Sequence, residues 1–157
     1  MIDELSCSFL NLKENRRMKV LVLCTGNSCR SQMGEAILRE INPELEVVSA
    51  GTKIADQVHP LAVKAMEEIG VDISSQRPKM VDEFLEDGVD YLISVCGGAK
   101  DACPAFLGPV GKRLHIGFDD PAYAEGTEEE IFEVFRRVRE EIRRDFAKFN
   151  EEYILNK

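Results

Sequence analysis

Two residues suited to nucleophilic and anion chemistry, Cys24 and Arg30, lie between an apolar run and a helical pattern. A thiolate is a strong nucleophile, and backbone N–H groups, a helix N-terminus or an arginine nearby favour it. A guanidinium group presents a planar fork of donors that matches two oxygens of an oxyanion. The pair therefore predicts attack by Cys24 on a tetrahedral oxyanion that Arg30 holds. The alternative is a buried structural cysteine in a strand-to-helix turn.

The residues between and just after this pair are small and polar, which suits a loop whose backbone amides bind an anion. A strand, a loop and a helix in that order direct successive N–H groups toward one point. We expect Gly26 to allow the tight turn and Ser31 to hydrogen-bond the sulfur of Cys24. The predicted oxyanion-binding residues are Thr25, Gly26, Asn27, Ser28, Cys29, Arg30 and Ser31.

Two further cysteines, Cys96 and Cys103, follow a third apolar run in the segment CGGAKDAC. This is not a zinc pattern, because Cys-x-x-Cys is absent and both histidines lie far away in the sequence. If residues 97–103 were helical, the two Cα atoms would be about 10 Å apart, beyond the ~7 Å limit for a disulfide. A Cys96–Cys103 bond would require that segment to unwind. The pattern is typical of a redox switch, and the alternative is two buried small hydrophobic residues.

The chain around these residues alternates strand-like and helix-like patterns. The predicted strands cover residues 18–24, 45–51, 89–96 and, more weakly, 112–118. Three helices are predicted. The first begins at Ser31, the second covers residues 59–70, and the third begins at the capping-box pair Thr127 and Glu130.

Strands that alternate with helices imply parallel pairing through right-handed crossovers. We therefore expect an α/β fold, a three-layer sandwich around a central four-stranded parallel sheet. Ligands of such sheets bind beyond the carboxyl ends of the strands. Cys24 and Cys96 each end a predicted strand, so both are expected at this edge.

Length and composition indicate one globular domain, which we place at residues 18–157 behind a flexible extension, residues 1–17. The net charge of −9 argues against nucleic-acid binding and requires that an anion site be built from local amides and cations. No stretch predicts a membrane span or a signal peptide. We expect a cytoplasmic monomer, where cysteines are more often catalytic, redox-active or metal-binding than structural.

The loop resembles the phosphate-binding loop of the low-molecular-weight tyrosine phosphatase fold, whose pattern is Cys-x4-Cys-Arg-Ser. The matching residues are Cys24, Cys29, Arg30 and Ser31. Within that fold, CTGNSCRSQMGE is more similar to the thioredoxin-coupled arsenate reductases, because the phosphatases typically have proline where this chain has Gln32. The resemblance covers the chain from residue 18 to about residue 149.

This resemblance implies reduction of arsenate, for arsenic resistance, by three cysteines that act in sequence. Cys24 would attack arsenate held by the loop amides and Arg30. Cys96 would then attack the Cys24–arsenic adduct, so that arsenite leaves and a Cys24–Cys96 disulfide forms. Cys103 would attack Cys96 and carry the disulfide outward to thioredoxin. No metal or other cofactor is implied, and phosphate would compete with arsenate.

The segment GFDDPAY, residues 117–123, resembles the general-acid loop of that family, in which an aspartate precedes a proline. Asp120 matches that position, and protonation of a departing oxygen is ordinary general-acid chemistry. Asp119 is the alternative carboxylate, although the order Asp-Pro favours Asp120. A simple Asp-Pro turn is the other interpretation.

Several members of that family bind potassium beside the loop through an asparagine, a glutamate, a serine and an aspartate. The first three match Asn27, Glu35 and Ser49, whereas the aspartate position falls at Lys79. An ammonium group there would replace the charge of the ion. We therefore expect Lys79 to act as a built-in cation and the activity to be insensitive to potassium.

Phosphomonoester hydrolysis is the nearest rival activity, because phosphate and arsenate have nearly the same shape. A phosphatase would form a phosphocysteine at Cys24 with the help of Arg30 and Asp120, but it would have no use for Cys96 and Cys103. A noncatalytic anion-binding or redox-sensing module is a third interpretation, against which the nucleophile, arginine and acid together argue. A relay that ends in a protein disulfide favours thioredoxin over glutaredoxin.

Overall fold

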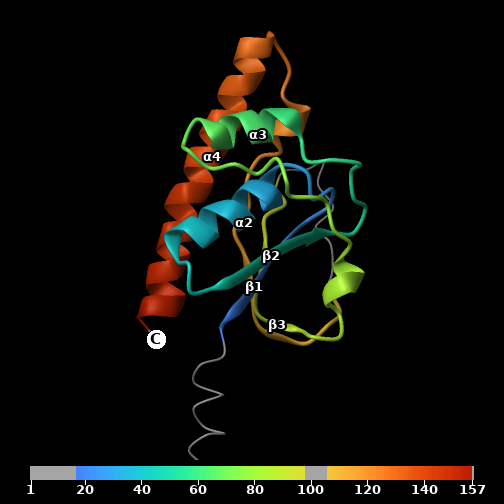
Figure 1. Ribbon diagram of the computed structural model, residues 1–157, viewed down its shortest axis with the longest axis vertical. Coiled ribbons are helices and arrows are strands. Elements are labelled where there is room, and N and C mark those ends of the chain that lie inside the picture. Colours follow the sequence, from blue (N-terminus) through green and yellow to red (C-terminus); the bar gives the residue numbers. More distant parts are fainter. Residues whose placement is uncertain (1–16, 98–105, 157) are drawn as a thin grey trace, which may run out of the picture.

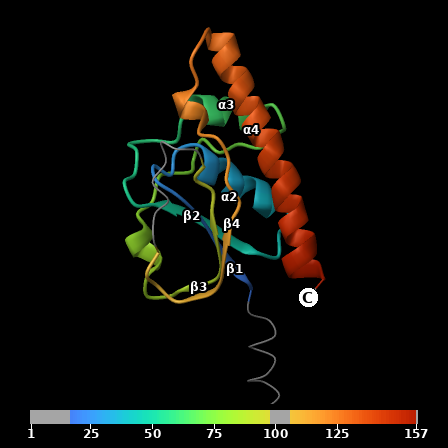
Figure 2. The same ribbon diagram turned by 180° about the vertical axis from the view of Figure 1, so that it is seen from behind.

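Four parallel strands form the central sheet of the protein. The computed structural model describes residues 17–97 and 106–156. The strands are β1 (Lys19–Cys24), β2 (Glu46–Gly51), β3 (Val89–Ser94) and β4 (Val110–His115). Their order in the sheet is β2-β1-β3-β4, and every neighbouring pair is parallel. Seen from behind, β3 and β4 run side by side (Figure 2).

The helices lie on both sides of this sheet. They are α2 (Arg30–Ile41), α3 (Pro60–Glu67), the 3-10 helices η1 (Val81–Phe84) and η2 (Pro121–Tyr123), α4 (Glu128–Phe149), and the π-helical end η3 (Asn150–Leu155). In Figure 1, α4 runs along one flank beside α2 and α3, whereas η1 lies at the opposite flank. The expected α/β sandwich around a four-stranded parallel sheet is confirmed.

Strand β1 is apolar after Lys19 because both of its faces are buried there. Val20 and Val22 pack in the larger core cluster with α2, α3 and α4. Leu21 and Leu23 pack in a smaller cluster with residues that include Phe106. These four side chains have no exposed surface. Their burial fixes the strand, and with it the position of Cys24 at its carboxyl end.

Helix α4 follows the sequence prediction closely. The Thr127 side chain caps it by accepting a hydrogen bond from the Glu130 N–H at 3.1 Å. Apolar side chains three or four positions apart then face the core. The buried apolar residues of α4 are Phe132, Phe135, Val138, Ile142, Phe146 and Phe149.

Two element boundaries differ from the sequence prediction. Strand β3 ends at Ser94, so Cys96 lies two positions beyond the strand instead of at its last residue. Strand β4 begins at Val110 and ends at His115, so the whole GFDDPAY segment follows the strand, and its last three residues form η2. The first shift moves Cys96 from a strand end to a loop, whereas Asp120 lies beyond the fourth strand in both the prediction and the structure.

Arg17, the first described residue, is held by the segment before β2. Arg17, the last residue of the predicted extension, donates hydrogen bonds to the carbonyl oxygens of Pro43, Glu44 and Leu45 at 2.6–3.1 Å. Residues 1–16 lie outside the described residues. Within the described ranges 17–97 and 106–156, no helix is long and apolar enough to cross a membrane.

Candidate active site

A pocket of about 500 Å³ opens at the carboxyl end of β1. Its floor is the oxyanion loop, which we define as residues 24–30, between β1 and α2. Lys53, Ile54, Asp120, Ala122 and Tyr123 also line the pocket. The structure therefore brings together the predicted nucleophile Cys24, the predicted anion ligand Arg30 and the predicted acid Asp120.

The sulfur of Cys24 is surrounded by hydrogen-bond donors. The Asn27 N–H donates to Cys24 Sγ at 3.2 Å, and Ser31 Oγ lies 2.8 Å from the same sulfur. Cys24 is only 2% exposed. The Nδ2 group of Asn27 donates to Ser31 Oγ at 2.7 Å, so the hydroxyl hydrogen of Ser31 is left to point at the sulfur. Both groups can therefore donate a hydrogen bond to the sulfur.

Asn27, and not Gly26, makes the tight turn of the loop. Asn27 has a positive φ of 51°, whereas the φ angle of Gly26 is not positive. Asparagine tolerates this left-handed conformation because its side chain can hydrogen-bond locally. The expectation that Gly26 allows the turn through its backbone freedom is therefore wrong. A Cβ at Gly26 would meet only Ser28 Oγ at 3.6 Å.

The segment after β2 packs directly onto the oxyanion loop. The N–H groups of Lys53, Ala55 and His59 donate to the carbonyl oxygens of residues 25, 26 and 28 at 2.9–3.0 Å. Gly51 permits this approach, because a Cβ there would lie 2.4 Å from the Thr25 carbonyl oxygen. The segment supplies Lys53 and Ile54 to the pocket wall, and no sequence motif indicated either residue.

Arg30 reaches across the pocket from the first residue of α2. Its Nη1 donates to the Phe118 carbonyl oxygen at 3.1 Å, and its Nη2 to Asp120 Oδ2 at 3.2 Å. Arg30 is 3% exposed and the Asp120 side chain 18%. The guanidinium group is therefore fixed in a buried position beside the loop amides, where it can bind an oxyanion.

Of the two neighbouring aspartates, only Asp120 lies at the pocket. Its Oδ1 accepts a hydrogen bond from the Ala122 N–H at 3.0 Å, which caps η2. Asp119 instead forms an exposed ion pair with Arg137 at 3.2 Å. The geometry therefore favours Asp120 as the acid.

Cys29 is also buried in the oxyanion loop, at 3% exposure. Burial is the main reason that its pKa is raised to about 12, while a contact with Ser28 opposes the shift. A thiol with such a pKa stays protonated and unreactive at neutral pH.

Cys96 lies beside the end of β1, in the loop that follows β3. The neighbouring Val95 N–H donates to the Leu23 carbonyl oxygen at 2.9 Å, which continues the pairing of β1 with β3. Cys96 is 2% exposed and disulfide-bonded, whereas Cys24 and Cys29 are free thiols. Cys103, the remaining predicted relay residue, lies outside the described residues.

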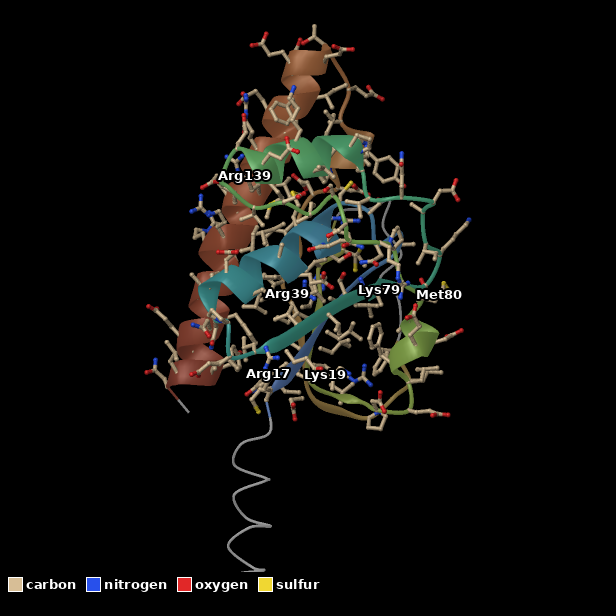
Figure 3. The ribbon with its side chains drawn as sticks, in the orientation of Figure 1. Arg17, Lys19, Arg39, Lys79, Met80 and Arg139 are labelled. Carbon is tan, nitrogen blue, oxygen red and sulfur yellow. The ribbon has the colours of Figure 1, made fainter. Side chains whose placement is uncertain are left out.

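A buried carboxylate, Glu35, lies behind the oxyanion loop and is neutralised by two cationic groups of the chain. Lys79 Nζ lies 3.4 Å from Glu35 Oε1, and Arg39 Nη1 lies 3.3 Å from Oε2; Figure 3 labels both cations. Ser49 Oγ also donates to Oε1 at 3.1 Å. Because each carboxylate oxygen already has a cationic partner, the residues do not fit an additional bound cation such as potassium.

Fold and site together define a class of protein. It is an α/β protein with a free, buried cysteine in a pocket loop, between the first strand of a parallel sheet and a helix. The family model of the low molecular weight phosphotyrosine protein phosphatases matches residues 19–156. The chain belongs to this family.

Several proteins to which the chain is similar carry the name arsenate reductase. The chain is 51% identical over 134 residues to the arsenate reductase of Halalkalibacterium halodurans, covering 84% of this chain and 94% of that protein. It is 47% identical over 133 residues to that of Bacillus subtilis, with the same coverage. A solved structure of an arsenate reductase in the phosphate-binding state has a TM-score of 0.71 and 31% identity, and covers 86% of this chain and 98% of its own.

Proposed function

We propose that this protein is an arsenate reductase that uses Cys24, Arg30 and Asp120 at the pocket and Cys96 and Cys103 as a disulfide relay. The observation that carries the proposal is a free Cys24 thiol in an oxyanion pocket beside a second, disulfide-bonded cysteine, Cys96. The names of the relatives at about half identity support the same activity.

The first step is the formation of a covalent arsenic adduct. The amides of the oxyanion loop and the guanidinium group of Arg30 hold arsenate. Arsenate competes with Asp120 for this guanidinium group, since the two side chains are paired in its absence. The thiolate of Cys24 then attacks arsenic, and protonated Asp120 gives its proton to the oxygen that departs as water.

The second step transfers two electrons to arsenic. The thiolate of Cys96 attacks Cys24 Sγ, and the sulfur–arsenic bond breaks. Its electron pair stays on arsenic, which passes from As(V) to As(III) and leaves as arsenite. The product on the protein is a Cys24–Cys96 disulfide.

The last steps restore the free Cys24 thiol. Cys103 attacks Cys96, which releases Cys24 and leaves a Cys96–Cys103 disulfide for reduction by thioredoxin. The disulfide at Cys96 together with the free thiol at Cys24 supports this assignment. We place the enzyme in the cytoplasm as a monomer that serves arsenic resistance, with phosphate as a competing anion.

Phosphomonoester hydrolysis is the second candidate function. The family model and the position of Tyr123 at the pocket favour it, because an aromatic ring can stack on an aryl phosphate. It needs Cys24, Arg30 and Asp120 but gives no role to Cys96.

The two functions are separated by assaying one preparation in two ways. Arsenate-dependent NADPH consumption is measured with thioredoxin and thioredoxin reductase, beside hydrolysis of p-nitrophenyl phosphate. We expect robust arsenate turnover, slow ester hydrolysis, and loss of both in Cys24→Ser. Efficient ester hydrolysis without arsenate turnover would instead assign the protein as a phosphatase.

A further inference from the structure

A buried glutamine, Gln32, has no role in the steps above yet contacts the oxyanion loop directly. Its side chain is fully buried in the first turn of α2. Its Nε2 group donates to the backbone oxygen and to Oδ1 of Asn27, both at 3.0 Å, and to the Arg77 carbonyl oxygen at 2.9 Å. Gln76 Nε2 in turn donates to Gln32 Oε1 at 2.7 Å. This last contact fixes which end of the Gln32 amide faces Asn27.

The contact with Gln32 sets the orientation of the Asn27 side chain. Asn27 Oδ1 accepts from two donors, Gln32 Nε2 and the Lys79 N–H, the latter at 2.8 Å. An oxygen that faces two donors leaves Nδ2 to face Ser31. The hydrogen bonds then form a chain with one direction: Asn27 Nδ2 donates to Ser31 Oγ, and the Ser31 hydroxyl donates to the sulfur of Cys24. Hydrogen bonds in such a chain polarise one another.

The donors at the head of this chain are anchored to the sheet. The Gly51 N–H at the end of β2 donates to the Lys79 carbonyl oxygen at 2.8 Å, and Met80 forms a parallel bridge with Gly51. Gln32 itself belongs to α2 and also holds the backbone at Arg77. The orientation of Asn27 is therefore determined by rigid elements and not by the loop alone.

We propose that Gln32 is a positioning residue for Cys24: it holds Asn27 so that Ser31 donates its hydroxyl hydrogen to the sulfur and favours the thiolate. This inference rests on Cys24 as the nucleophile, as proposed above, but it does not depend on which oxyanion is the substrate. Gln32 touches neither the sulfur nor the anion, so its effect is transmitted through Asn27 and Ser31.

The experiment measures the reactivity of Cys24 without any substrate. The reduced protein is alkylated with iodoacetamide between pH 5 and pH 10, and mass spectrometry of the peptide that contains Cys24 gives the rate at each pH. In Gln32→Met, which keeps the length of the side chain but removes its donors, we expect the profile to move about one unit to higher pH. The rate below the midpoint would fall about tenfold, since one unit is a tenfold change in thiolate fraction.

Three comparisons make the result specific. Gln57→Met makes the same change at an exposed position and leaves the profile unchanged. Ser31→Ala moves the profile in the same direction as Gln32→Met. Adding Gln32→Met to Ser31→Ala moves it no further, because the chain through which Gln32 acts is already broken.

Two results would overturn the inference: a folded Gln32→Met protein with the wild-type profile, or shifts that add in the double variant. If Gln32→Met does not fold, Gln76→Met tests the same point from a less buried position, and an unchanged profile there also counts against it. Arsenate turnover is measured separately, so an altered profile in a protein without arsenate turnover would overturn the proposed function and leave the role of Gln32 intact.

Discussion

Side chains that lie behind the oxyanion loop determine the surroundings of Cys24 as much as the loop does. Asn27 takes the left-handed turn, and Ser31 and the Asn27 N–H contact the sulfur. The spacing of Cys24 and Arg30 was enough to predict a nucleophile and an anion ligand. It could not show the contacts of Gln32 with Arg77 and of Asn27 with Lys79 behind the loop, because these partners lie 45 and 52 positions apart in the sequence.

Lys79 gives a prediction about cations. Lys79→Met removes a cationic partner from Glu35, whose side chain is 3% exposed. An incompletely paired buried charge costs about 1–3 kcal/mol or more, so we expect a lower free energy of unfolding in choline chloride. Potassium chloride at equal concentration should restore part of the loss, because the ion can take the place of the ammonium group. Urea titrations in the two salts measure both effects.

Wild type and Lys148→Met are the controls for this prediction. Lys148 is an exposed lysine near the end of α4, 3.9 Å from Glu152, so neither protein should respond to potassium. A clear gain in stability or rate of the wild type on exchanging choline for potassium would show that Lys79 does not replace the ion.

The loops after the strands place the site, and their positions depend on close backbone contacts between distant segments. Apolar runs predicted the strands and the sheet edge at which Cys24 and Cys96 lie, and helical spacing predicted the helix after Thr127. The pocket wall at Lys53 and Ile54 was not predictable, because backbone hydrogen bonds between residues 53–59 and the oxyanion loop place it. Such bonds involve no side chain and leave no pattern in the sequence.

Gly51→Ala tests the packing between these two segments. A Cβ at this position would lie 2.4 Å from the Thr25 carbonyl oxygen and 3.1 Å from the Asn27 nitrogen. Backbone atoms must move to admit it, so we expect the free energy of unfolding to fall by about 1–3 kcal/mol. We expect the activity to fall by a larger fraction than the stability does. Gly26→Ala, whose Cβ would meet only ordinary contacts, should keep the wild-type stability. Equal stabilities of Gly51→Ala and wild type in urea titrations would argue against this packing.

The contact between α3 and α4 makes stability depend on pH. Glu68, at the end of α3, has a pKa lowered to about 2, mainly by hydrogen bonds from Arg136 and then from Arg139. When folding lowers the pKa of a carboxyl group, the ionised group stabilises the folded protein at pH values above the pKa of the unfolded state, which is about 4.3 for glutamate. This stabilisation is lost as the pH falls toward 2. Glu68 and Arg136 are both partly exposed, so their ion pair contributes only modestly to stability.

Glu68→Gln should therefore be less stable than wild type at pH 6, and the difference should shrink at pH 2.5. Glu86→Gln, at an exposed position in the turn after η1, serves as the matched control and should show no such change. Unfolding by urea at the two pH values gives the comparison. A constant difference for Glu68→Gln would contradict the role of its ion pairs.

The whole molecule joins an oxyanion pocket to a second cysteine at one edge of the sheet. With a net charge of −9, the protein attracts no anion at long range, so the loop amides, Arg30 and Lys53 must supply the local field. The disulfide at Cys96, together with the free thiol at Cys24, is the feature that favours reduction over hydrolysis. The fold and the place of Cys24 at the carboxyl end of β1 were predictable from the sequence, but the oxidation state of Cys96 was not.

A single-turnover measurement tests the relay most directly, because it needs no reductant. Fully reduced protein is mixed with excess arsenate, and arsenite per chain and the disulfide pairing are determined. Wild type and Cys103→Ser should each release about one arsenite, and Cys103→Ser should stop with a Cys24–Cys96 disulfide. Cys96→Ser should release none while keeping any slow hydrolysis of p-nitrophenyl phosphate. Release of one arsenite per chain by Cys96→Ser would contradict the proposed role of Cys96 in the relay.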